Sequence, residues 1–184
     1  EALRPGPTQT VVVSVWDPTN AGHQPRGKQH LNPHGIWYTS VSGIWQTPWL
    51  EPVPRAHICS LHIAPRVSDH SVEVEADLAC SGPPPPDAGP LELGVEVVDG
   101  GRQVAAGRGP ADAPVRVRIP SAKLWSPESP HLYDLVLTLW CGTQVVDRVT
   151  SYTGLRSIEV QRDSGGVRRL YLNGRPMFMF GPLD

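Results

Sequence analysis

Two adjacent aromatic residues, Trp37 and Tyr38, are the side chains of this sequence whose chemistry best suits a bound ligand. A flat aromatic ring stacks on the apolar face of a sugar, while the indole N–H or phenol O–H stays free to bond a hydroxyl group. The nearby Arg26-Gly27-Lys28-Gln29 adds cations that suit an anionic sugar, although a solvated loop is the simpler explanation. We therefore expect a carbohydrate to bind at Trp37 and Tyr38.

Three histidines in the same polar loop, His23, His30 and His34, suggest a zinc site as an alternative. A metal site normally holds its ligands on rigid elements, with further hydrogen bonds that orient them. Residues 23–34 show no such pattern, and the three cysteines of the chain lack Cys-x-x-Cys spacing. We predict neither a metal site nor a cofactor.

The tryptophans also mark a boundary. Residues 35–54 hold three of the six tryptophans and end on Pro52-Val53-Pro54, which stops any strand. We expect a domain to end there. Trp45 and Trp49 are predicted to pack in a core or at a domain interface, because large aromatic residues dominate the buried area of small β domains.

The elements that position these residues are predicted to be short strands. The chain of 184 residues has 21 prolines and 18 glycines and no helical periodicity, so its fold class is all-β. Residues 10–17 are predicted as a buried strand, followed by a turn at residues 17–22. One strand cannot close a β-sandwich, so we expect residues 1–54 to be only part of one.

From residue 56 onward the pattern predicts an immunoglobulin-like β-sandwich. In residues 71–80 apolar and charged side chains alternate strictly, which is typical of a half-buried antiparallel strand with Cys80 facing inward. Cys141 has the same inward register on its own strand, so buried free thiols are favoured and a Cys80–Cys141 disulfide is the alternative. Hairpin turns are expected at Asp99-Gly100-Gly101 and Cys141-Gly142. The seven predicted strands cover residues 58–64, 71–80, 91–98, 102–106, 115–119, 132–140 and 143–152.

The pattern changes after Gly154. Residues 157–160 and 169–172 flank Asp163-Ser164-Gly165-Gly166, which predicts a two-stranded ribbon. Met177-Phe178-Met179-Phe180 is a short apolar run of the kind found in fully buried strands.

The charge pattern excludes several partners. The formal net charge is −2 with acids and bases interspersed, so the chain has no basic surface for nucleic acid or for an anionic membrane. No apolar run approaches the roughly 20 residues that span a bilayer. The N-terminus has no apolar signal region and starts abruptly, as a fragment does. The oligomeric state stays open.

Three motifs, in this order, resemble glycoside hydrolase family 2, the family of β-galactosidases, β-glucuronidases and β-mannosidases. They are Ser42-Gly43-Ile44-Trp45-Gln46-Thr47 with Trp49-Leu50-Glu51, Leu124-Trp125-Ser126-Pro127-Glu128-Ser129-Pro130-His131-Leu132-Tyr133, and Gly154-Leu155-Arg156 with Tyr171-Leu172-Asn173-Gly174-Arg175-Pro176. Thr153 departs from the family, which often carries Phe there.

The resemblance implies the end of a jelly-roll sugar-binding β-sandwich at residues 1–55. It also implies an immunoglobulin-like sandwich at residues 56–154 and the lead-in and first strand of a catalytic (β/α)8 barrel at residues 155–184. The partner it implies is the remainder of the same protein, and it slightly favours a secreted or periplasmic location.

The resemblance also implies a retaining glycosidase, in which one carboxylic acid protonates the leaving oxygen and a second carboxylate attacks the anomeric carbon. In the family the acid/base glutamate follows an Asn, and no Asn-Glu pair occurs here, so we assign no catalytic residue and expect this chain alone to be inactive. Solvated strand faces and turns explain Glu51, Glu73, Glu75, Glu92, Glu96 and Glu128.

Asp184 follows the expected first barrel strand, and the C-terminal ends of barrel strands line the active sites of this fold. A contact between Asp184 and the substrate is predicted, with a loop or capping role as the alternative. The galactosidase branch has an acidic residue where Trp37 stands, which argues against galactose as the sugar.

Two other functions suit the same sequence. A stand-alone carbohydrate-binding or adhesion module built from β-sandwiches is the first, and a structural spacer is the second. Residues 154–184 argue against both, because they have no place in a complete sandwich but suit the start of a barrel.

Overall fold

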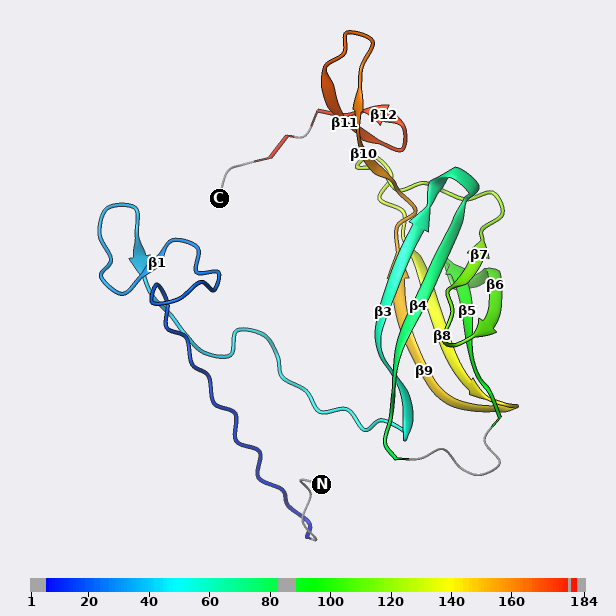
Figure 1. The fold of residues 1–184 in the computed structure, drawn as a ribbon, viewed down its shortest axis with the longest axis horizontal. Helices are drawn as coiled ribbons and strands as arrows, with labels where there is room; N and C mark the ends of the chain where they lie inside the picture. The colour runs from blue at the N-terminus through cyan, green and yellow to red at the C-terminus, as the bar shows by residue number, and fades with distance from the viewer. Residues whose placement is uncertain (1–5, 83–88, 179, 182–184) are drawn as a thin grey trace. The chain divides into compact units, whose positions relative to one another are not determined.

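The structure, a computed structural model, describes residues 6–82, 89–178 and 180–181. The chain divides into two compact units, residues 1–51 and 52–184, and each is described by itself (Figure 1). Within the described ranges, no helix has the length and apolar character needed to cross a membrane.

The second unit is built on two antiparallel sheets that share one core (Figure 1). The three-stranded sheet has the order β3 (Ala56–Arg66), β4 (Ser71–Cys80), β7 (Val115–Arg118). The four-stranded sheet has the order β6 (Arg102–Pro110), β5 (Leu91–Asp99), β8 (Tyr133–Cys141), β9 (Gln144–Thr153). These seven strands confirm the predicted all-β sandwich, and each overlaps one of the seven predicted ranges.

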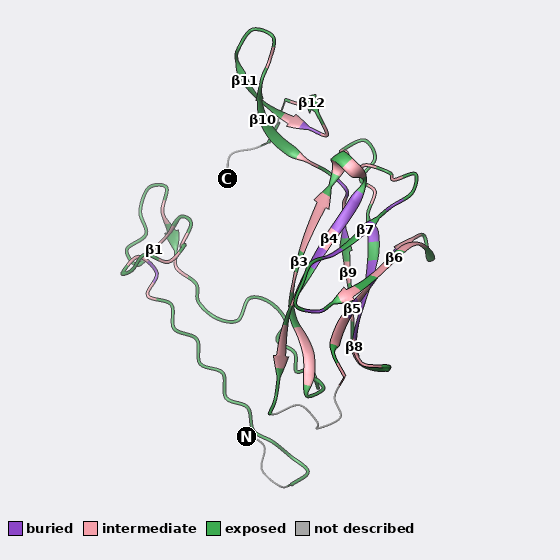
Figure 2. Ribbon diagram, turned by 45° about the vertical axis from the view of Figure 1, so that its right-hand side comes forward, coloured by how far each residue is buried: buried purple, intermediate pink, exposed green. Residues whose placement is uncertain are grey.

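Alternation along the strands builds the core. Successive side chains of a strand point to opposite faces, so every second residue of β5, β7, β8 and the first half of β4 reaches the space between the sheets. Figure 2 shows the buried residues gathered on these strands. The fully buried side chains contribute about 1.5–3 kcal/mol each to folding. They include Val72, Val74, Leu93, Val95, Val97, Val117, Tyr133, Leu135, Leu137 and Leu139.

The length of β6 departs from the prediction. The strand continues from Ala106 to Pro110, because its ladder with β5 runs on to the pair Glu92 and Pro110. The segment Gly107-Arg108-Gly109 has little strand propensity of its own. A Cβ at Gly107 would lie 2.9 Å from Val117 Cγ2, so the glycine permits a close approach of β6 to β7. Tertiary pairing decides the end of this strand.

Glycines with positive φ make the two predicted hairpin turns. Gly100 and Gly101, between β5 and β6, have φ angles of 58° and 82°. Two consecutive positive φ angles match the right-handed twist of the flanking strands. Gly142, between β8 and β9, has a φ of 60°. The predicted turns are confirmed.

The inward register of Cys80 does not make it buried, and that prediction was wrong. The core covers only the first half of β4: Val72 and Val74 are fully buried, Leu78 is half-buried and Cys80 is exposed. Only residues 71–74 of β4 pair with β7, so the end of the strand extends beyond that part of the sheet. Cys141 is half-buried, and all three cysteines are free thiols.

A three-stranded ribbon follows the sandwich. It consists of β10 (Ile158–Arg162), β11 (Arg168–Leu172) and β12 (Arg175–Pro176). Asp163 closes the turn, because its carboxylate accepts hydrogen bonds from the backbone N–H groups of Gly165 and Val167, each at 2.9 Å. The two predicted strands are confirmed, and β12 adds a third strand that was not predicted.

The buried strand predicted for Met177 to Phe180 does not form among its described members. Met177, Phe178 and Phe180 lie outside any strand, and Phe178 and Phe180 are 87% and 92% exposed. Met177 donates its N–H to the carbonyl of Leu170 in β11 at 2.9 Å and is half-buried. Phe178 and Phe180 have no such strand beside them, and composition alone cannot bury them. Met179 lies outside the described residues.

The first unit has little regular structure. Its only described strands are β1 (Gln29–His30) and β2 (Tyr38–Thr39), which form a short parallel bridge. The buried strand predicted for residues 10–17 was wrong, since this segment is extended, unpaired and mostly exposed. A strand needs a neighbour for its ladder of hydrogen bonds, and the described part of this unit offers none there. The turn at residues 17–22 is confirmed, with Asp17 Oδ1 accepting the N–H of Thr19 at 2.8 Å.

Trp45 and Trp49 were predicted to pack in a core or at a domain interface. The packing in a core was wrong, while the packing at a domain interface stays a prediction. Their side chains are 90% and 79% exposed. Aromatic composition favours burial only where other residues form a core to receive the ring. Residues 41–51 form no strand or helix that could do so.

Candidate functional site

Trp37 lies in a loop of the first unit and contacts two cationic or ionisable neighbours. The Cζ atom of Arg26 lies 5.5 Å from the centroid of the indole ring, within the range of a cation–π interaction. The ring of His30 lies 5.7 Å from Trp37, tilted by 44°. The half-buried Trp37 is therefore partly covered by its own loop, and it is a less open platform than the sequence suggests.

Backbone and amide hydrogen bonds hold this loop in shape. Tyr38 donates its N–H to the carbonyl of Lys28 at 2.8 Å, and the side chain of Gln29 accepts the N–H of Val41 at 2.8 Å. A turn closes on Trp37, whose N–H donates to His34 O at 2.9 Å. These bonds bring Arg26 and Trp37 together although eleven positions separate them.

Tyr38 differs from Trp37 in its surroundings. Its side chain is 65% exposed, and among the described residues no ring or cation is recorded against it. Tyr38 thus offers the free aromatic surface of the loop, while Trp37 is engaged by Arg26 and His30. The roles of both residues as sugar contacts stay a prediction.

Two of the three histidines lie together. The rings of His30 and His34 are 5.9 Å apart, and the Nδ1 atom of each lies near the carbonyl of Asn32, at 3.1 and 2.8 Å. Within the described ranges no group of three or more His, Cys, Asp or Glu side chains could hold a metal ion. The loop therefore presents a pair of imidazoles rather than a full set of metal ligands.

In the second unit, the structure brings the second and third sequence motifs together. Asn173 links them, because its amide N–H donates to Trp125 O at 2.9 Å and its amide oxygen accepts the N–H of Ser157 at 3.0 Å. The guanidinium of Arg156 lies 4.6 Å above the Trp125 ring. Trp125 also donates its N–H to Leu155 O at 3.0 Å. The ribbon is thus tied to the end of the sandwich at Trp125.

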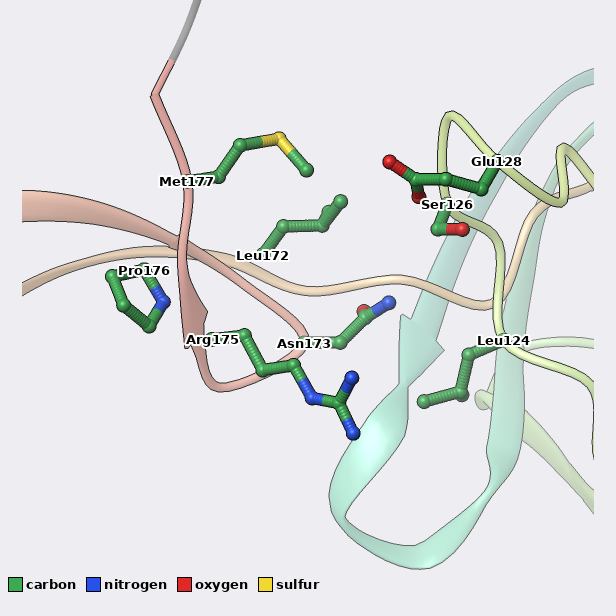
Figure 3. A pocket seen from close by; sticks show the side chains of 8 residues that line it. All are labelled: Leu124, Ser126, Glu128, Leu172, Asn173, Arg175, Pro176 and Met177. Atoms are coloured by element: carbon green, nitrogen blue, oxygen red, sulfur yellow. The ribbon is translucent and has the colours of Figure 1, made fainter.

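A cavity of about 360 Å³ opens beside this junction. Figure 3 shows side chains from the loop that precedes β8 on one side and from the ribbon on the other. Its lining combines an anionic side chain, Glu128, and a cationic one, Arg175, with apolar surface. The complete lining is Leu124, Ser126, Glu128, Leu172, Asn173, Arg175, Pro176 and Met177. Asp184, the third predicted contact, lies outside the described residues.

Several carboxyl groups have a displaced pKa, and every one of these pKa values is lowered. The backbone N–H of Glu128, followed by the Ser126 hydroxyl, lowers the pKa of the Glu128 carboxyl. A hydrogen bond from Arg66 does the same for the pKa of Glu73, and one from Lys123 for the pKa of Asp99. The pKa values of the Asp69 and Asp163 carboxyl groups are lowered as well. Each of these carboxyl groups is stabilised in its ionised form by the hydrogen bonds that it accepts.

Two features of the site were not predicted from the sequence. The contact of Arg26 with Trp37 and the cavity beside Asn173 depend on chain reversals between residues distant in the sequence. The sequence held a partial signal for the contact of Arg26 with Trp37, since Arg26 and Lys28 are the only Lys or Arg residues between positions 5 and 54. The cavity has no comparable signal.

The seven strands of the second unit form an immunoglobulin-like β-sandwich, with the ribbon at its end. The chain belongs to glycosyl hydrolases family 2, whose family model matches residues 56–156.

Curated relatives agree with this assignment. A β-galactosidase of Klebsiella pneumoniae (strain 342) is 28% identical over 202 residues, which cover 97% of this chain and 17% of that protein. A putative β-glucuronidase of Formosa agariphila is 32% identical over 146 residues, or 76% of this chain and 17% of the relative. The chain thus spans about a sixth of the length of these relatives.

Solved structures share the fold. The apo β-glucuronidase from Ruminococcus gnavus matches with a TM-score of 0.51 and 20% identity, over 70% of this chain and 20% of that chain. Its complex with uronic isofagomine matches with the same TM-score and identity. At this identity the likeness concerns the fold alone.

Proposed function

We propose that this chain is a non-catalytic portion of a retaining glycoside hydrolase that cleaves β-glycosidic bonds. The observation that carries the proposal is the match of the family model to the sandwich, residues 56–156. The names of the curated relatives, β-galactosidase and putative β-glucuronidase, support β-glycosides as the substrate class.

We further propose that the chain hydrolyses nothing by itself. A retaining enzyme needs two carboxyl groups about 5–5.5 Å apart, one of them protonated at the start of the reaction. In the family the acid/base glutamate follows an Asn, and no Asn-Glu pair occurs in the sequence. This supports a catalytic centre supplied by other parts of a longer protein.

The proposed domain boundaries stay those of the sequence: residues 1–55, 56–154 and 155–184. The middle domain is supported by strands that run from Ala56 to Thr153. Residues 155–184 are proposed to lead into a (β/α)8 barrel, whose parts would cover the ribbon and the exposed Phe178 and Phe180. Trp37, Tyr38 and Asp184 are proposed to contact the substrate.

Two experiments test the proposal. The chain should show no turnover of a panel of aryl β-glycosides above a heat-killed control, and turnover at that level contradicts the inactivity of the chain. The reading frame beyond Asp184 should encode an Asn-Glu pair and a second glutamate at the ends of later barrel strands. A stop codon directly after Asp184 contradicts the enzyme proposal and favours a stand-alone sugar-binding module instead.

A further inference from the structure

We propose that the cavity between the ribbon and the loop that precedes β8 binds a small dipolar ion, an aliphatic molecule with an ammonium group at one end and a carboxylate at the other. The inference is separate from the proposed glycosidase function, because it concerns the second unit alone and a ligand other than a sugar. It rests on the charges of Glu128 and Arg175, on the apolar surface between them and on the hydrogen bonds that hold both walls.

Glu128 and Arg175 place opposite charges on two walls of one cavity. Glu128 lies on the loop that precedes β8, and Arg175 lies on β12 of the ribbon. Figure 3 shows both charged groups directed into the space between loop and ribbon, with Leu172 and Asn173 between them in this view. Among the described residues, neither group forms an ion pair with the other or with a third residue. The cavity therefore presents an unpaired anion and an unpaired cation to one ligand.

Both groups carry their charge in the free chain. The backbone N–H of Glu128, followed by the Ser126 hydroxyl, favours the ionised carboxylate and lowers the pKa of Glu128. The guanidinium of Arg175 stays protonated in proteins. Both side chains are exposed, so an ammonium group can approach Glu128 while a carboxylate approaches the planar fork of Arg175.

Apolar side chains line the space between the two charges. Leu172 is 5% exposed, and Leu124 and Met177 are half-buried. The lining that the structure describes contains no aromatic ring on which a sugar could stack. A chain of methylene groups suits such a surface, because removing each of them from water is favourable. The cavity is therefore suited to an aliphatic ligand rather than to a sugar.

Hydrogen bonds hold both walls in place. The backbone groups of Ser126 and Ser129 bond each other at 3.0 and 3.1 Å, which closes a tight loop around Glu128. On the ribbon side, Asn173 bonds the backbone on both sides of the junction at 2.9 and 3.0 Å, and Met177 donates its N–H to β11 at 2.9 Å. A cavity with fixed walls needs little rearrangement to accept a ligand.

Size restricts the ligand further. Small-molecule sites have volumes of about 300–1,000 Å³, so a cavity of about 360 Å³ suits a molecule at the small end of that range. The ligand must also reach both charges at once. Its affinity should therefore depend on the number of methylene groups that separate its two ends.

The experiment is an NMR titration of the whole chain, followed through the backbone amide signals of the cavity lining. The probes are β-alanine, γ-aminobutyrate, ε-aminocaproate and ω-aminooctanoate at one ionic strength. Hexylamine, hexanoate and D-glucose are controls that lack one or both charges. We expect one chain length to bind best, with a dissociation constant of about 1–10 mM, and at least about fivefold more tightly than any control.

Two variants remove the charges one at a time. Glu128→Gln and Arg175→Gln should each weaken binding of the best amino acid by about three- to fivefold, because each removes one exposed ion pair with the ligand. Glu75→Gln and Arg168→Gln are the matched controls. They make the same chemical changes at exposed positions outside the lining and should leave binding unchanged.

Several results overturn the inference. Equal affinity for a control compound shows that the two charges are not recognised together, and equal affinity for all chain lengths shows that they are not bridged. Unchanged binding in Glu128→Gln or Arg175→Gln, or equal weakening in the control variants, places the ligand elsewhere. A failure of all four amino acids to saturate the signals below about 50 mM removes the site. These results leave the glycosidase proposal intact, since that proposal fails only through the turnover and reading-frame tests.

Discussion

The side chain of Asn173 is predicted to hold the ribbon against the sandwich. It accepts the N–H of Ser157 at 3.0 Å and donates to the carbonyl of Trp125 at 2.9 Å, and both bonds are partly buried. Asn173 also has a φ of 51°, a left-handed conformation that Asn tolerates and most residues do not. Removing the side chain therefore tests both its hydrogen bonds and its conformation.

The magnitude follows from these contacts. Two hydrogen bonds contribute about 1 kcal/mol each, so Asn173→Gly should destabilise the docked ribbon by about 2 kcal/mol while it keeps the left-handed backbone. Asn173→Ala adds a conformational cost of about 1 kcal/mol, for a total of about 3 kcal/mol. A change of 2 kcal/mol is roughly a thirtyfold change in the opening equilibrium.

The assay is amide hydrogen exchange, compared between the ribbon strands β10 and β11 and the sandwich strands β5 and β8. Asn173→Gly should speed exchange in the ribbon about thirtyfold and leave the sandwich strands near their original rates. Asn173→Asp is a second variant: its carboxylate still accepts from Ser157 but sets an acceptor oxygen against the carbonyl of Trp125, so it too should speed exchange in the ribbon and spare the sandwich. Unchanged exchange in the glycine variant, or equal acceleration in the sandwich, would refute the reasoning.

Three further predictions concern stability. Leu137→Ala removes a fully buried side chain and should lower the free energy of unfolding by about 2–5 kcal/mol in urea denaturation, whereas a change below 1 kcal/mol contradicts the assigned core. Trp45→Ala should change it by less than about 0.5 kcal/mol, because the ring is 90% exposed, and a larger loss would show that the ring packs after all. Asp163 has a pKa lowered from its ordinary value of 3.8, chiefly by the hydrogen bond from Arg169. Its stabilisation of the ribbon is therefore present above pH 3.8 and is lost as the pH falls through the lower, folded-state pKa. Exchange of the ribbon amides, corrected for intrinsic rates, should show this loss in the parent chain and not in Asp163→Asn; an equal pH dependence in both refutes it.

The sequence specified the sandwich because its signals are local. Alternation in residues 71–80 and 133–141 requires only that one face of each strand meets a core, and the Gly-Gly and Cys-Gly turns supply the positive φ angles that join neighbours. The strands β10 and β11 on either side of Asp163 are equally local, since they and their turn lie within fifteen residues. These elements match the structure closely.

Prediction failed where an apolar segment needed a neighbouring strand or core that its own residues do not supply. Residues 10–17 and 177–180 carry apolar runs typical of buried strands, yet residues 10–17 have no neighbouring strand, and Phe178 and Phe180 are exposed. Met177 alone bonds a strand, through its N–H to the carbonyl of Leu170. The core packing predicted for Trp45 and Trp49 failed for the same reason. Hydrophobic composition favours burial, but only a second surface can provide it.

The candidate sites likewise combine features that the sequence predicts with contacts that only the structure shows. By itself the sequence determined the aromatic pair Trp37 and Tyr38, the cations near them and the order of the three family motifs. Only the tertiary structure decided that Arg26 lies on Trp37 and that Asn173 joins Trp125 to Ser157, because such contacts depend on where the chain reverses direction. Residue types and spacing report which chemistry is available, while hydrogen bonds between distant segments decide which groups meet.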